Sequence, residues 1–168
     1  DYETLQAIPS ARDPWVMLER APGITMDRAN VAGTQSGQQS GYVARGAGTF
    51  QNKWSIDGVD ITDMSATGAS PIYYDFDMLE EMQVTTGGAD VTQQTGGVGI
   101  NLVTKSGTDR FRGNARFLVT DDALQGDNVT DELRAQGAGA GAPIQNIKDY
   151  GFDVGGPIVR SKLWYWGS

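Results

Sequence analysis

Two stretches of this sequence indicate its fold best: WSIDGVDITD at residues 54–63 and GGVGINLVTK at residues 96–105. The first has apolar residues on both sides of Asp57-Gly58, a dipeptide that is typical of tight hairpin turns. The second opens with glycines and then has apolar or β-branched residues at every other position from Val98 to Thr104, which is the spacing of a strand. Together they predict a hairpin over residues 53–62 and a strand over residues 98–104.

Further elements can be predicted outward from these stretches. A short helix precedes Pro22-Gly23, and its start has two interpretations: Ser10 caps it, with Asp13 completing a capping box, or Asp13 caps it with Pro14 in the first helical position. Asp75 can cap a helical turn over residues 76–80. That turn leads into a predicted strand over residues 82–86, which ends at two glycines.

After Gly107 the pattern changes to long alternating runs. Residues 111–120 alternate apolar or small side chains with mostly polar ones, and residues 150–155 do the same after a long connection. A short turn and an aromatic run then close the sequence. A long connection followed by a short turn is typical of outer-membrane barrels, but a soluble sheet with one wet face alternates identically. The alternation alone favours the soluble sheet.

The composition excludes several classes of function. The 168 residues carry a net charge of −8, and such an acidic chain is a poor candidate for nucleic-acid binding, which needs a basic surface. It contains no Cys and no His, which removes disulfides, thiolate nucleophiles and the Ser-His-Asp triad. No run of 18 apolar residues is present, and the sequence therefore predicts no transmembrane helix.

No group of residues has the spacing of a catalytic or metal site. Asp57, Asp60 and Asp63 miss the spacing of a calcium loop, and turn formation explains the first of them. The Gly-Ala repeat at residues 137–142 lacks the flanking strand and helix of a dinucleotide site. Glu80-Glu81 would point to opposite faces of a strand and make a poor acid–base pair. We expect no catalytic residue, no metal and no cofactor.

Taken in order, the motifs of residues 5–168 resemble those of one family. They are a helix ending in Pro-Gly, an Arg-Gly segment, an Asp-Gly-Val hairpin, a turn leading into a strand, and a glycine-led strand ending in Ile-Asn-x-x-Thr-Lys. In this chain they are Ala21–Gly23, Arg45-Gly46, Ile56–Val59, Met78–Thr86 and Gly97–Lys105. This order is similar to the plug domain of TonB-dependent outer-membrane receptors. Residues 155–158 and 162–167 look like barrel strands of the Oar-like branch of that family.

The resemblance implies an α+β plug domain with a small mixed sheet over residues 1–108. Residues 109–168 would then form the first two to three antiparallel strands of a transmembrane β-barrel, with a long outer loop at about 121–148. It also implies a location in the bacterial outer membrane, contact with its lipid, an imported ligand of unknown identity, and no enzymatic activity. A TonB-type energy-transducing partner would act through a segment upstream of Asp1, and we expect the chain to be a piece of a longer protein.

The resemblance also implies where the ligand binds. The outward apices of such plugs follow the Arg-Gly segment, the Asp-Gly hairpin and the turn before the glycine-led strand. The expected ligand-binding residues are Arg45, Thr62, Asp63, Tyr73, Tyr74, Gln93 and Gln94. Alternatively, the two tyrosines pack the plug against the barrel wall. Two further hypotheses are a soluble or surface-attached β-rich binding module without transport and a carboxylate-dependent hydrolase.

Overall fold

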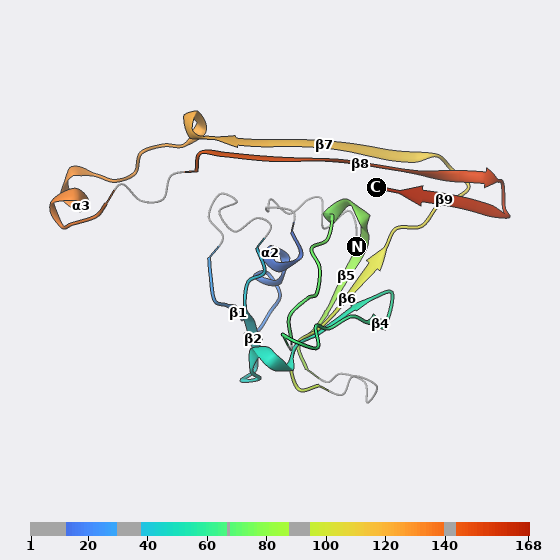
Figure 1. Cartoon of the computed structure of the whole chain (residues 1–168), viewed down its shortest axis with the longest axis horizontal. Coiled ribbons are helices and arrows are strands. Elements are labelled where there is room, and N and C mark those ends of the chain that lie inside the picture. Colours follow the sequence, from blue (N-terminus) through green and yellow to red (C-terminus); the bar gives the residue numbers. More distant parts are fainter. Residues whose placement is uncertain (1–12, 30–37, 67, 88–94, 140–143) are drawn as a thin grey trace.

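The computed structural model describes residues 13–29, 38–66, 68–87, 95–139 and 144–168. Its N-terminal part, up to about residue 105, packs beneath a sheet of three long strands (Figure 1). In order, the elements of the N-terminal part are α2 (Pro14–Leu18), β1 (Ile24–Met26), β2 (Tyr42–Ala44), η1 (Thr49–Gln51), β3 (Lys53–Ile56), β4 (Val59–Asp60), η2 (Phe76–Met78), β5 (Leu79–Thr85) and β6 (Gly99–Thr104). None of the helices in the described residues is long and apolar enough to cross a membrane.

The start of helix α2 follows the second of the two interpretations. Asp13 is the cap: its Oδ1 accepts hydrogen bonds from the backbone N–H of Trp15 at 2.8 Å and of Val16 at 3.1 Å. Pro14 occupies the first helical position, where its missing N–H costs nothing. All five helical residues are buried, so this short helix is held by packing rather than by its own length.

The central sheet is mixed, as the sequence resemblance implied. Its strand order is β4-β3-β6-β5, in which β3 and β6 are parallel and the other pairs are antiparallel. The β3–β4 hairpin turns at Asp57 and Gly58, which have φ of 48° and 82°, the positive values that a tight two-residue hairpin turn requires. Strand β5 begins at Leu79, three residues before the predicted start, because the turn η2 is shorter than predicted.

An aromatic cluster forms the centre of the N-terminal part. Trp54 is 0% exposed and its ring centroid lies 5.4 Å from Trp15, 6.0 Å from Tyr74 and 6.1 Å from Tyr42. Burial raises the pKa of the Tyr42 hydroxyl strongly, so this side chain stays neutral throughout the physiological range. Aliphatic side chains of α2, β5 and β6 complete the core around the cluster.

The C-terminal part is a three-stranded antiparallel sheet in the order β7-β8-β9. Its strands are β7 (Arg112–Asp121), β8 (Asn146–Val159) and β9 (Leu163–Gly167). Facing residues such as Asn114 and Asp153 pair across β7 and β8, so one face of this sheet carries polar side chains. The opposite face is largely apolar. On it, the exposed Phe117 lies opposite Tyr150, and the exposed Phe152 lies opposite Ala115. The predicted long alternating strands are therefore confirmed.

The connection between β7 and β8 runs over residues 122–145, slightly shorter than predicted, because pairing continues to Asp121 and Asn146. It contains η3 (Asp122–Leu124) and α3 (Asp131–Ala135). Thr130 caps α3, and its Oγ1 accepts from the Leu133 N–H at 3.4 Å. Nearly all of the described residues of this connection are exposed.

Asp109 ties the segment after β6 to the turn between β8 and β9. Its Oδ1 accepts from the Ser161 N–H at 2.6 Å and from the Trp164 Nε1–H at 2.8 Å, and its Oδ2 accepts from the Ser161 hydroxyl at 3.1 Å. Ser161 has a φ of 59°, a left-handed conformation that is uncommon for a residue with a side chain. The hydrogen bonds to Asp109 therefore stabilise a strained turn.

Replacing Asp109 with Ala should loosen this turn. The hydrogen bond from the Ser161 backbone is the main cause that lowers the pKa of Asp109, so the carboxylate supports the folded turn above the ordinary aspartate pKa of about 3.9. That support is lost as the pH falls through the lowered value. Hydrogen exchange of residues 159–165 should be faster in Asp109→Ala at neutral pH, whereas Glu132→Ala in the exposed helix α3 should leave it unchanged. Equal exchange in Asp109→Ala and the wild type would contradict this role.

Candidate functional site

The segment from Ile61 to Tyr74, which we call the apex loop, contains four of the seven predicted site residues. It leaves β4 and runs to η2. Gly68 at its middle has a φ of 83° and lies directly against the backbone of Thr49 and Phe50, so the apex loop packs on η1. The turn η1, which precedes β3, and the apex loop, which follows β4, are therefore in contact.

Thr62 and Asp63 shape the apex loop through hydrogen bonds within the protein. Thr62 Oγ1 accepts from the Trp54 N–H at 2.9 Å and donates to Asp60 Oδ1 at 2.8 Å. Asp63 Oδ1 accepts from the Ser65 hydroxyl and N–H, both at 2.7 Å, and these hydrogen bonds lower the pKa of its carboxyl group. Both side chains thus have structural partners.

The two adjacent tyrosines have different environments. Tyr74 is half-buried, stacks on Trp54 with an interplanar angle of 18°, and its hydroxyl is hydrogen-bonded to Ser70. Burial raises the pKa of the Tyr74 hydroxyl. Tyr73 is 63% exposed, although its ring lies 5.8 Å from Trp15 at an angle of 59°. In this chain Tyr74 packs inward on the aromatic cluster, and Tyr73 presents its outer face to the surface.

Arg45 lies outside the apex loop. It follows β2 with a φ of 52° and is exposed. Its guanidinium lies beside Gly87 at the end of β5, so close that a Cβ at position 87 would come within 3.3 Å of Arg45 Nη1. The predicted residues Gln93 and Gln94 lie outside the described residues. Of the predicted residues, Thr62 and Tyr74 therefore meet at Trp54, whereas Arg45 lies beside Gly87.

Three exposed apolar residues on the same surface were not predicted. Met64 is 97% exposed, Phe50 is 75% exposed and Ile72 is 50% exposed. Met64 and Ile72 belong to the apex loop, and Phe50 belongs to η1 beneath it. The sequence does contain a signal for them, since each stands in a segment rich in Gly, Ser or Thr where no strand or helix period accounts for a large apolar side chain.

Comparison with known proteins identifies the N-terminal part. Residues 1–100 match the family described as the TonB-dependent Receptor Plug Domain. The chain belongs to this family. Residues 103–168 match the family described as the Outer membrane beta barrel domain, so the three long strands are strands of a barrel. The chain is therefore a protein of the bacterial outer membrane.

Two individual proteins are similar to this plug and its strands. The TonB-dependent transporter Oar of Myxococcus xanthus is 30% identical over 154 residues, which cover 89% of this chain and 13% of that protein. The crystal structure of the siderophore receptor PirA from Acinetobacter baumannii shares the fold with a TM-score of 0.67 at 21% identity, covering 98% of this chain and 22% of that chain. This chain thus spans less than a quarter of the length of either relative, and both relatives are transporters or receptors rather than enzymes.

Proposed function

We propose that this chain is the plug and the first barrel strands of a transporter that binds a scarce ligand and imports it, without bond chemistry. The observation that carries the proposal is the position of the plug, which lies on one side of β7 and β8 (Figure 1). That side carries Arg116, Asp149 and Asp153, while the other side carries exposed apolar side chains. A polar lumen around a plug and an apolar outer surface are the features of a plugged barrel. Outer-membrane lipid would cover the apolar face.

The energy for import would come from a TonB-type protein of the inner membrane that acts on a segment upstream of Asp1. The family to which the plug belongs supports this partner. We also propose that the plug covers residues 1–108 and the barrel strands begin within residues 109–168. Asp109 supports this boundary, because it fixes the connecting segment to the β8–β9 turn.

The ligand would bind on the apex loop and on Arg45, which lies outside that loop. Tyr73 offers an exposed aromatic face, Arg45 offers a positive charge, and Met64 offers an apolar contact. Gln93 and Gln94 remain candidates from the resemblance alone. Thr62, Asp63 and Tyr74 would act by holding the shape of the apex loop, since their polar groups already have partners. This combination suits a ligand with both polar and flat apolar parts.

The double substitution Arg45→Ala with Tyr73→Ala in the full-length transporter should weaken ligand binding and uptake by about tenfold or more, because it removes a charge and an aromatic contact. Insertion into the outer membrane should be unchanged. The readouts are surface binding and uptake of the compound that the wild-type protein imports, with membrane fractionation in parallel.

A matched control removes the same residue types elsewhere. Tyr150 is 75% exposed on the apolar face of β8, and Arg160 is exposed in the turn after it. Tyr150→Ala with Arg160→Ala should leave binding unchanged. Wild-type binding in the Arg45/Tyr73 variant would move the ligand site to the barrel loops.

A further inference from the structure

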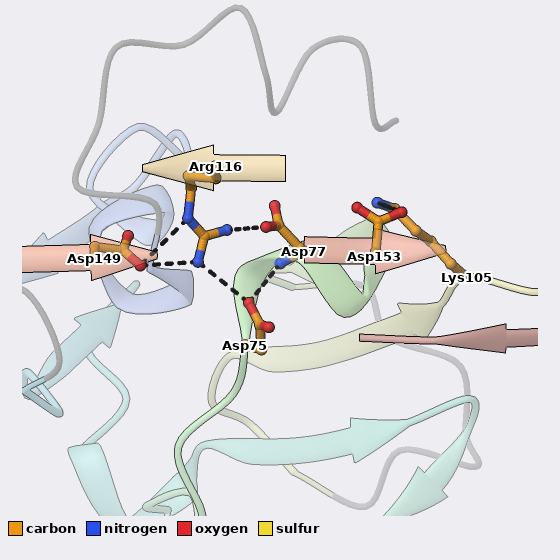
Figure 2. Close-up of polar contacts among 6 residues, drawn as sticks. All are labelled: Asp75, Asp77, Lys105, Arg116, Asp149 and Asp153. Atoms are coloured by element: carbon orange, nitrogen blue, oxygen red, sulfur yellow. Dashed lines mark hydrogen bonds and ion pairs between the residues drawn. The ribbon is translucent and has the colours of Figure 1, made fainter. Parts of the chain in front are cut away.

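An ion-pair cluster joins the plug to the barrel wall. The Arg116 cluster consists of Arg116 on β7, Asp149 on β8, and Asp75 and Asp77 at η2 of the plug, and Figure 2 shows the guanidinium reaching all three carboxylates. Arg116 Nη2 lies 2.9 Å from Asp149 Oδ1 and 3.4 Å from Asp75 Oδ1, while Arg116 Nη1 pairs with Asp77 Oδ2. One side chain therefore bridges residues 33 and 41 positions away in the sequence.

The cluster is buried at its centre. The side chain of Arg116 is 8% exposed and that of Asp77 is 0% exposed. Burying a charge is costly unless it is paired, so the buried charges of Arg116 and Asp77 depend on each other. At this point η2 of the plug contacts β8, and its Asp77 pairs with Arg116 on β7.

A glycine in the barrel wall makes room for this contact. Gly151 on β8 faces Arg116 on β7, and a Cβ at position 151 would lie 3.2 Å from Arg116 Nη2 and 3.3 Å from Asp77 Oδ2. Both distances are shorter than ordinary van der Waals contacts to carbon. The absence of a side chain at Gly151 thus forms a notch in the wall, in which the carboxylate of Asp77 meets the guanidinium.

The docked segment directly follows the end of the apex loop. Asp75 follows Tyr74 directly, and its Oδ1 accepts from the Asp77 N–H at 3.0 Å, which caps η2. Tyr74 is held on the plug side by stacking on Trp54. The last residues of the apex loop are therefore fixed between the aromatic cluster of the plug and Arg116 of the barrel.

We propose that Arg116 is a positioning residue of the transporter, which docks η2 in the Gly151 notch and so sets the position of the apex loop relative to the barrel wall. This inference rests on the proposed ligand site, because the apex loop is the part of the plug to which we assign binding. Because the cluster holds three negative charges and one positive charge, losing Arg116 should disturb it more than losing one aspartate. Three carboxylates surround one guanidinium, so removing Arg116 leaves three like charges together, whereas removing the charge of Asp77 leaves Arg116 with two partners.

The test is hydrogen exchange, followed by mass spectrometry, on the full-length protein in detergent without ligand. Arg116→Gln should make residues 71–79 exchange about tenfold faster or more, while residues 53–60 of the hairpin keep wild-type exchange. Asp77→Asn should give a smaller increase in the same segment. Gly151→Ala should also accelerate it, since the new methyl group pushes Asp77 and Arg116 apart.

Matched controls separate docking from general effects. Arg134→Gln removes an arginine that also pairs with two aspartates, Asp127 at 2.6 Å and Asp131 at 3.4 Å, but in the exposed outer connection. Gly126→Ala adds a methyl group where nothing lies within 4 Å. Both should leave residues 71–79 unchanged. Should Arg116→Gln prevent insertion, Arg116→Lys keeps the charge but reaches fewer carboxylates, and it should give an intermediate increase confined to the same segment.

Three results would overturn the inference: wild-type exchange of residues 71–79 in Arg116→Gln, an effect of Asp77→Asn equal to or larger than that of Arg116→Gln, or equal acceleration of residues 53–60 and 71–79. The last result would mean that Arg116 stabilises the plug as a whole. Because exchange is measured without ligand, this test can fail while the Arg45/Tyr73 binding test succeeds, and the reverse also holds.

Discussion

Trp54→Ala should destabilise the plug by about 3–5 kcal/mol, the largest effect that we expect from a single substitution in this chain. The Trp54 side chain is 0% exposed and contacts the rings of Trp15, Tyr42 and Tyr74, so its removal leaves a cavity at the junction of α2, β2 and the apex loop. The loss should appear as faster proteolysis of the plug in the folded full-length protein, while the barrel stays resistant.

Phe50→Ala is the control for Trp54→Ala. Phe50 is also an aromatic residue of the plug, but it is 75% exposed, and its loss should change stability by less than about 0.5 kcal/mol. Equal proteolysis of the Trp54→Ala and Phe50→Ala variants would show that the aromatic cluster is not the centre of the core.

Gly68→Ala should destabilise the apex loop by about 2–4 kcal/mol, through two additive causes. A φ of 83° costs a residue with a Cβ about 1 kcal/mol relative to glycine. The Cβ would also overlap the Thr49 carbonyl oxygen and approach Phe50 Cα to 3.0 Å, and overpacking of this kind costs about 1–3 kcal/mol. We expect the apex loop to lift from η1, which hydrogen exchange of residues 63–72 would report.

Gly58→Ala separates the two causes. Gly58 has nearly the same φ, 82°, but a Cβ there would meet nothing within 4 Å. It should therefore show the conformational cost alone, about 1 kcal/mol. If Gly68→Ala were no more destabilising than Gly58→Ala, the close contact between the apex loop and η1 would not contribute to stability.

The features that could be predicted from the sequence are those determined by neighbouring residues. Asp57-Gly58 predicts its hairpin because both positions need a positive φ, and the alternation of residues 111–120 predicts a long strand because successive side chains point to opposite faces. The order of the motifs also identified the family, which the comparisons confirm. The alternation could not distinguish a barrel strand from a soluble one, since both have one apolar face.

Other features were decided only by the tertiary structure. Tyr73 and Tyr74 are neighbours in the same segment, yet only the packing of Trp54 determines that Tyr74 is half-buried and Tyr73 is exposed. The docking of Asp77 on Arg116 joins the turn η2 of the plug to strand β7 of the barrel, and nothing in the local sequence of either one indicates the other. By itself, the sequence determined the hairpin, the long strands and the family. The tertiary structure decided which side chains of the apex loop are exposed and which side chains pair the plug with the barrel strands, because those contacts form between segments that are distant in the chain.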